Sequence, residues 1–196
     1  ALKAVGYDGV EVPIFDASDP KHYRRLCQIL DDIGLQRTIV ALLPDEEHSA
    51  ISANANHRRG AASHLRSVIE CGAELGGSVL VGPYYQALGQ FTGERPTDTE
   101  LVHAAEVHRE IALIAKSANM VCALEPLNRF EAHLLNTCEQ AASYAARAAV
   151  MRALDEMPDV EKTSLFGTAV HAVLKSETAK PAELAARLAA AGLAVD

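Results

Sequence analysis

Two kinds of hydrophobic pattern alternate along the first part of the chain. Short, nearly continuous apolar runs predict strands, and segments in which apolar residues recur every three or four positions predict amphipathic helices. The predicted strands cover residues 7–15, 36–44, 78–85 and 120–126. The predicted helices cover residues 19–33, 59–77 and 99–119, and a further helix begins over residues 137–148. Strand and helix therefore alternate regularly.

This alternation is typical of a parallel sheet covered by helices, an α/β fold. The connections before the strands are short glycine turns (GYDG, GLQ, LGG), whereas the loops after the strands are long and polar. This asymmetry is typical of a barrel or an open sheet whose site lies at the carboxyl ends of its strands.

The pattern changes after about residue 147. No strand follows the last helix directly. Two short strands, EKTSLF and TAVHAVLK, are joined through Gly167, and a helix with the sequence PAELAARLAAAGL begins at Pro181. We therefore expect residues 1–147 to form a partial (β/α) barrel of about four parallel strands, and residues 148–196 to form a small α+β unit in the order helix–strand–strand–helix.

Composition and charge exclude some classes of partner. The chain is 49% hydrophobic and 22% charged, which is ordinary for a globular protein. A net charge of −8 disfavours a nucleic-acid partner. No apolar run approaches the roughly 18 residues of a membrane span. The start of the sequence lacks the pattern of a secretory signal and an initiator methionine, which indicates that the beginning of the chain is missing. Four scattered cysteines favour free thiols in a cytoplasmic protein.

The strongest chemical signal lies in residues 122–137, CALEPLNRFEAHLLNT. Glu125 ends an apolar strand directly before Pro126, where a carboxylate can bind a divalent cation or move a proton. A solvated loop acid is the alternative. Glu131 reaches the same edge only if the loop curls, and Arg129 between the two glutamates offers a local ion pair as another explanation. Glu11, within the first strand, faces either a barrel mouth or an exposed edge.

Other polar groups give weaker signals. Glu100 and His103 have the spacing of a carboxylate–histidine metal motif, but a single copy favours an ordinary surface helix. Glu106, His108 and Glu110 are expected on the same solvated face. The motifs of nucleotide-binding folds and of common hydrolases are absent from the sequence.

The segment EPLNRFEAHLLNT (125–137) resembles the strand-end motif of the D-tagatose/D-psicose 3-epimerase group of xylose-isomerase-like TIM barrels. Upstream segments agree in the same order: GYDGVEVPIF, TIVALLP, a helix ending in CGAELGG, and VLVGPYYQALGQFTGERPTDTE. The resemblance covers about residues 1–145, and its most specific part is the E-x-L-N-R-F-E core.

The resemblance implies a small-molecule sugar substrate and a divalent metal (Mn²⁺, Co²⁺ or Mg²⁺) that supports proton transfer beside a ketose carbonyl through an enediolate. Glu125 is then a metal ligand and one of two acid/base glutamates, and Glu131 hydrogen-bonds the sugar. The remaining roles are that Asn128 and Arg129 fix the loop, that Gly82, Tyr84 and residues 86–97 wall the pocket, and that Glu11 corresponds to a strand-end acid.

The chain also departs from this family. A TIM barrel has eight strands in about 250 residues, whereas this chain offers four, the second to the fifth. The family's other ligands, an aspartate, a histidine and a second glutamate, are not found among residues 148–196. The tail around VEKTSLFGTAVHAVL resembles the C-terminal extension of ABC-transporter ATPase subunits. We therefore expect weak metal binding and very low activity.

Two alternatives stay open from the sequence. In the first alternative, the chain is a non-catalytic protein that forms a homo-oligomer or associates through exposed sheet edges. In the second alternative, the tail closes the sheet into a complete fold of another topology, and Glu125 is only an acidic residue at the edge of the sheet, without a catalytic role.

Overall fold

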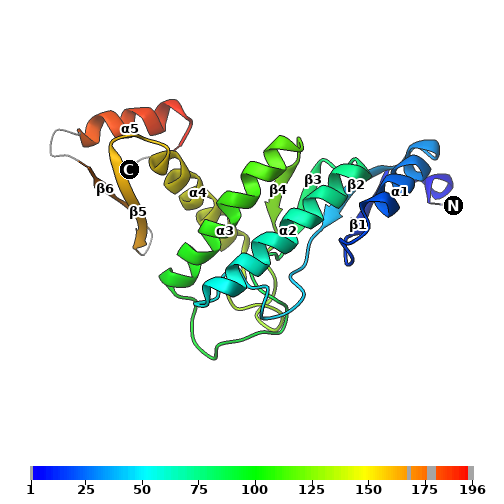
Figure 1. Ribbon diagram of the computed structural model, residues 1–196, viewed down its shortest axis with the longest axis horizontal. Coiled ribbons are helices and arrows are strands. Elements are labelled where there is room, and N and C mark those ends of the chain that lie inside the picture. The colour runs from blue at the N-terminus through cyan, green and yellow to red at the C-terminus, as the bar shows by residue number, and fades with distance from the viewer. Residues whose placement is uncertain (1, 167–168, 176–179, 194–196) are drawn as a thin grey trace.

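The computed structural model describes residues 2–166, 169–175 and 180–193. Strand and helix alternate as predicted (Figure 1). After a short 3₁₀ helix, Lys3–Val5, the elements are β1 (Gly9–Pro13), α1 (Pro20–Asp32), β2 (Gln36–Val40), α2 (Ala55–Leu75), β3 (Val79–Gly82), α3 (Asp98–Ser117), β4 (Val121–Leu124) and α4 (Cys138–Asp155). They are followed by β5 (Val160–Phe166), β6 (Ala169–Leu174) and α5 (Pro181–Ala190).

Two helices extend beyond the predicted ranges, for local reasons. α2 begins at Ala55, earlier than predicted, because the side chain of Asn54 accepts a hydrogen bond from the backbone of Asn56 and caps the helix. α4 begins with a capping box made by Thr137 and Gln140 and continues to Asp155. Residue 147 therefore lies inside a continuous helix, and the domain boundary there stays a prediction.

The four strands β1 to β4 form one parallel sheet in chain order, β1-β2-β3-β4. Successive helices pack beside one another on one side of this sheet (Figure 1). The fit is close where α2 meets β2, because a Cβ on Gly72 would lie 2.2 Å from Cδ1 of Ile39. The predicted partial barrel is confirmed: within the described residues the sheet does not close, and β1 and β4 each pair with one strand only.

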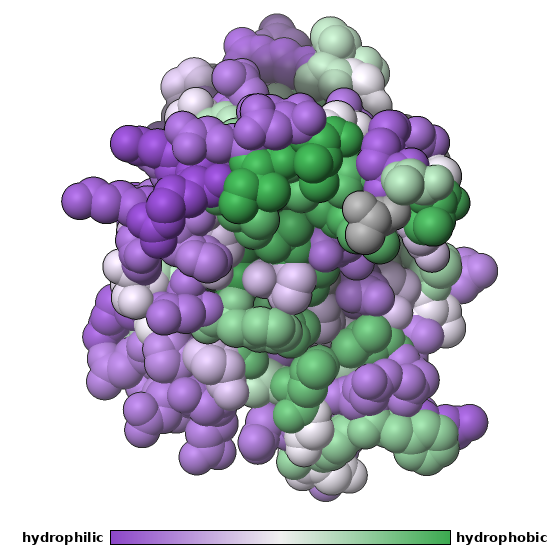
Figure 2. All heavy atoms as spheres, turned by 90° about the vertical axis from the view of Figure 1, so that its right-hand side faces the viewer, coloured by the Kyte–Doolittle hydropathy of each residue, from purple (hydrophilic) through white to green (hydrophobic). Residues whose placement is uncertain are grey.

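The open sheet leaves apolar side chains accessible. Apolar residues gather on the face of the molecule at the β1 end (Figure 2). The large exposed apolar residues of this region are Leu2, Val5, Tyr7, Phe15, Ile29 and Ile33. At the other end, Val121 of β4 is 64% exposed. Both ends of the sheet therefore present surface that another chain segment could cover.

The C-terminal elements form a separate small unit. β5 and β6 pair antiparallel with each other, and in the described residues neither joins the four-stranded sheet. The alternative in which the tail closes the sheet is therefore wrong. The unit packs on α4 through a small apolar cluster of Leu154, Val160, Leu184 and Leu188. Gly167, expected to join the two strands, lies outside the described residues. Among the described residues, no helix has the length and apolar character that a bilayer crossing requires.

Candidate functional site

Glu125 follows β4 directly, and its backbone is fixed while its side chain is accessible. Its N–H donates to the carbonyl oxygen of Gly82 at 3.0 Å. The hydroxyl of Tyr85 lies 3.2 Å from the carbonyl oxygens of both Glu125 and Leu135, and its single hydrogen is shared between them. Burial raises the pKa of Tyr85 to about 12, so the phenol keeps its proton and remains a donor. The strand end is therefore rigid, and the exposed carboxylate of Glu125 is free to meet a ligand.

Gly82 ends β3 where the backbones of two strands come very close. Its φ of +143° is a conformation that side chains rarely adopt, and a Cβ there would lie 2.2 Å from the carbonyl oxygen of Ala41. The glycine therefore sets the geometry of the strand end to which Glu125 is bonded.

The loop after Glu125 curls back on itself, and the role of Glu131 at the sugar stays a prediction. Asn128 accepts the N–H of Phe130 at 2.9 Å through its Oδ1 and donates its amide to the Glu131 carboxylate. Asn136 closes the loop by donating to the carbonyl oxygens of Leu127 and Ala132, both at 2.8 Å. The loop thus places Glu131 next to Asn128.

Arg129 does not form the local ion pair that was the alternative explanation of this segment. Its guanidinium lies over the ring of Phe130, 5.9 Å from the centroid, and within the described residues it pairs with neither Glu125 nor Glu131. The two glutamates are therefore not neutralised by Arg129. The loop of residues 86–97 lies against the same segment, since the N–H of Gly89 donates to the carbonyl oxygen of Glu131 at 2.9 Å.

The side chain of Tyr84 is buried against α3. It is 2% exposed, its ring packs edge-on against His108 of α3 at 5.3 Å, and it lines an apolar cavity of about 530 Å³ between α3, β4 and α4. The prediction that His108 lies on a solvated face is wrong. His108 is 2.7 Å from the hydroxyl of Tyr144 and 3.2 Å from the carbonyl oxygen of Tyr84. The role of Tyr84 as a pocket wall stays a prediction.

Glu11 is far from Glu125 along the sheet. Val12, Ile39, Leu80 and Cys122 stand side by side in the strand register. Glu11 precedes this row by one residue and Glu125 follows it by three, which separates them by about 13 Å along the strands. Glu11 stands in the middle of β1, not at its end, and accepts a hydrogen bond from Thr38 at 3.4 Å.

The carboxyl end of β4 and residues 125–131 of the loop that follows it, called the rim below, do not provide a complete metal site. Mn²⁺ and Mg²⁺ take about six oxygen ligands, of which proteins supply several carboxylates or carbonyls. Glu125 is one such donor, and the part of the chain that the structure describes holds no group of three or more His, Cys, Asp or Glu side chains that could hold a metal ion. The donor set of the described residues is therefore too small for a divalent metal, and the roles of Glu125 as a metal ligand and as an acid/base group stay predictions.

Two residues that were not singled out individually from the sequence hold the loops at the rim together. Tyr85 anchors the ends of the β4 loop, and Gln86, 1% exposed, accepts the N–H groups of His133 and Leu134 through its Oε1, each at 3.1 Å. The sequence does contain a signal for them: the polar groups of Tyr85 and Gln86 follow directly after an apolar strand and a Gly-Pro break.

The chain matches the family described as xylose isomerase-like TIM barrel over residues 1–154, and it belongs to this family. A probable ketose 3-epimerase of Synechocystis sp. is 29% identical over 140 residues, which cover 70% of this chain and 47% of that protein. The L-ribulose 3-epimerase of Mesorhizobium japonicum is 28% identical over 142 residues, with 72% and 47% covered. The chain therefore spans about half the length of the curated relatives it matches.

Solved structures agree with this placement. The structure of an L-ribulose 3-epimerase superposes with a TM-score of 0.68 at 26% identity and covers 80% of this chain and 55% of that one. The D-psicose 3-epimerase of Clostridium cellulolyticum H10, solved with D-tagatose, gives a TM-score of 0.68 at 19% identity over 75% of this chain and 52% of that one, and so supports the fold alone. The family match ends at residue 154. The resemblance of the tail to ABC-transporter ATPase subunits thus stays a prediction.

Proposed function

We propose that this chain carries part of the active site of a ketose 3-epimerase. The observation that supports the proposal most directly is the position of Glu125: an exposed carboxylate on a fixed backbone, at the carboxyl end of a parallel strand. Epimerisation beside a carbonyl requires a base that removes a proton from the carbon and an acid that returns it on the other face. The relatives named as 3-epimerases support the same reaction class.

In this proposal the residues of the rim have different roles in proton transfer and in sugar binding. The Glu125 carboxylate takes the proton from C3 of the ketose, and the electron pair moves toward the carbonyl oxygen to give an enediolate. Glu131 hydrogen-bonds the sugar, held in place by Asn128. Gly82, Tyr84 and residues 86–97 border the ligand. Arg129, whose guanidinium lies over the ring of Phe130, fixes the loop together with Asn128.

A second acid/base group and further ligands for Mn²⁺, Co²⁺ or Mg²⁺ are needed for full activity. Because the described residues hold no metal-binding cluster, we propose that this chain alone binds the metal weakly and reacts slowly. We place the reaction in the cytoplasm, with a free or phosphorylated sugar as substrate.

The proposal is tested by exchange of the C3 proton of a ketose with solvent. The chain is incubated with D-fructose and Mn²⁺ in D₂O, and loss of the C3 proton signal is followed by NMR. We expect slow exchange that Glu125→Gln abolishes and Glu139→Gln, which alters an exposed acid at the start of α4, leaves intact. No exchange by the unaltered chain, or equal exchange by Glu125→Gln, contradicts the proposal.

Self-association is a second candidate, favoured by the two unpaired sheet edges. The apolar cavity of about 530 Å³ beside β4, lined by Cys122, Ala123 and Leu124, suits apolar side chains from a fifth strand. We expect concentration-dependent dimers in sizing chromatography, and Val121→Lys on exposed β4 to shift them toward monomer. A strict monomer with cooperative melting contradicts this candidate.

A further inference from the structure

A second cavity, of about 560 Å³, lies outside the rim that carries Glu125. It is bounded by the β2–α2 loop, the β3–α3 loop, the first turns of α2 and α3, and His133 from the β4–α4 loop. The loop of residues 86–97, proposed to border the ligand at the rim, also lines this cavity, whereas Glu125, Glu131 and Gly82 do not. Its volume is within the range of cavities that bind small molecules.

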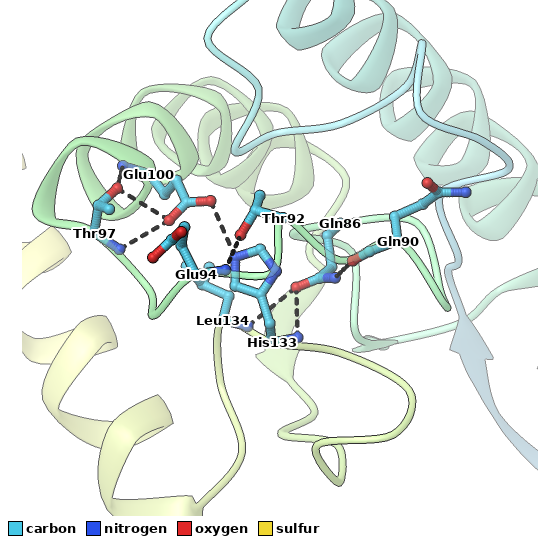
Figure 3. A network of polar contacts seen from close by, with 8 residues as sticks. All are labelled: Gln86, Gln90, Thr92, Glu94, Thr97, Glu100, His133 and Leu134. Carbon is cyan, nitrogen blue, oxygen red and sulfur yellow. Dashed lines mark hydrogen bonds and ion pairs between the residues drawn. The ribbon is translucent and has the colours of Figure 1, made fainter.

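Two of the lining residues form a largely buried histidine–glutamate pair. Nε2 of His133 lies 3.0 Å from Oε1 of Glu100, and the two side chains are 9% and 14% exposed. The other carboxylate oxygen of Glu100 accepts the backbone N–H of Thr97 at 2.8 Å and its hydroxyl at 3.0 Å. Both oxygens of Glu100 are therefore occupied, and the carboxylate can only accept from His133 (Figure 3).

The pair leaves one imidazole nitrogen unsatisfied. Because Nε2 carries the hydrogen that Glu100 accepts, Nδ1 of neutral His133 is an acceptor. This atom is buried and has no hydrogen-bond partner among the described residues, and Nδ1 of His103, which also lines the cavity, is in the same situation. Buried polar atoms are rarely left without a partner in folded proteins.

The imidazole of His133 is also held rigidly, as a binding group should be. The backbone N–H groups of His133 and Leu134 both donate to Oε1 of Gln86, and Nε2 of Gln86 donates to the carbonyl oxygen of Gln90 at 2.8 Å (Figure 3). Loops that are distant in sequence thus meet at His133, and its ring lies between Glu100 and Gln86.

The remaining lining selects the kind of ligand. Hydroxyl groups of Ser49 and Thr99 line the cavity, and a hydroxyl both donates and accepts. The negative charges of Glu46 and Glu94, offset by Arg95, disfavour an anionic ligand. An ammonium ion is also disfavoured, because it can donate hydrogen bonds but cannot accept one from the hydroxyl groups of Ser49 and Thr99. Phe91, 49% exposed, supplies an apolar face for the carbon atoms of a ligand.

We propose that this cavity binds a small neutral polyol, one hydroxyl of which donates to Nδ1 of His133. A polyol without a carbonyl group cannot be epimerised, so its binding is measured separately from the epimerase reaction. The probe is therefore D-glucitol, a hexitol that has no carbonyl group, and inorganic phosphate serves as the anionic comparison.

The experiment follows the imidazole nitrogen resonances of the ¹⁵N-histidine-labelled chain at about pH 8, where a free imidazole is neutral. We expect D-glucitol to shift the Nδ1 resonance of His133 saturably, and phosphate to leave it unchanged. His133→Gln keeps an amide donor for Glu100 but removes the acceptor at Nδ1, so this variant should weaken D-glucitol binding at least about tenfold. His22→Gln, at an exposed position of α1, is the matched control and should bind as the unaltered chain does.

Phe91→Ala provides a variant at the exposed mouth that does not disturb the buried pair, and should weaken binding about threefold or more. If His133→Gln does not fold, the affinity of Phe91→Ala for D-glucitol tests the proposal instead. Three results overturn the proposal: no saturable shift with D-glucitol, unchanged affinity in Phe91→Ala, or loss of binding in Glu125→Gln, which would move the polyol to the rim. A shift produced by phosphate alone would replace the polyol with an anion.

Discussion

The backbone N–H of Glu125 donates to the carbonyl oxygen of Gly82 at 3.0 Å, so the candidate carboxylate is aligned by the residue at which β3 ends. Gly82 in turn contacts β2 so closely that no side chain fits between them. The position of Glu125 thus depends on three adjacent strands and on a glycine that no other residue replaces without strain.

Replacement of Gly82 by alanine should therefore destabilise the fold strongly. The new Cβ would meet the Ala41 carbonyl oxygen at 2.2 Å, in a backbone conformation that favours glycine. We expect a loss of at least about 3 kcal/mol in the free energy of unfolding, measured by urea denaturation. Gly89→Ala is the matched control: φ is +73° but nothing lies within 4 Å, so about 1 kcal/mol should be lost. Equal losses in the two variants would show that the contact with Ala41 is not tight.

Gln86 should prove equally important for the loops at the site. Gln86→Leu leaves the N–H groups of His133 and Leu134 buried without an acceptor, which should cost about 2–4 kcal/mol. Hydrogen exchange by NMR should show these two amides losing protection first. Gln90→Leu is the control, because the Gln90 side chain is exposed and its carbonyl oxygen is unaffected; we expect a change within about 0.5 kcal/mol. Retained protection in Gln86→Leu would contradict the role of Gln86.

The sequence was sufficient to predict the order of the elements because their signals are local. The apolar run before Glu125 and the glycine turns before the strands depend on neighbours within a few residues, and the four-stranded parallel sheet follows from them. The match to the EPLNRFE motif likewise lies within one loop. The family match over residues 1–154 agrees with it.

The partners of individual side chains could not be predicted in the same way. Helical periodicity placed His108 on a solvated face, but α4 packs there and presents Tyr144 to it. Glu100 was compared with His103, its neighbour on the helix, whereas it pairs with His133 from another loop. In both cases the decisive contact joins residues more than 30 positions apart, and a single sequence carries no local trace of it.

His108 should make stability depend on pH. Burial lowers its pKa from 6.5 to about 4, so the folded chain binds this proton less readily than the unfolded chain. Stability is then fully present above pH 6.5 and falls as the pH drops toward 4, because in that window the unfolded chain takes up the proton. The shift corresponds to about 3 kcal/mol, and since His108 keeps some accessible surface we expect about 2 kcal/mol.

The measurement for His108 is the difference in unfolding free energy between about pH 7.5 and pH 4.5, compared between the unaltered chain and His108→Gln. The variant should lose about 2 kcal/mol less on acidification, since glutamine does not titrate. His22→Gln, in which an exposed histidine is replaced, should retain the full dependence. If His108→Gln and the unaltered chain respond alike, the pKa of His108 does not differ between the folded and unfolded chain.

Binding of Mn²⁺ measures how much of a metal site these residues make. With a single carboxylate at the rim and no cluster of three ligands in the described residues, calorimetry should give a dissociation constant of roughly millimolar or weaker. Glu125→Gln should remove this residual binding, while Glu139→Gln, at an exposed acid on α4, should preserve it. One-to-one binding at micromolar affinity by the monomer would mean that further ligands come from residues of this chain that do not stand near Glu125 in the structure. The same affinity confined to a dimer would instead place the missing ligands on the second copy, and would join the metal site to the unpaired edges of β1 and β4.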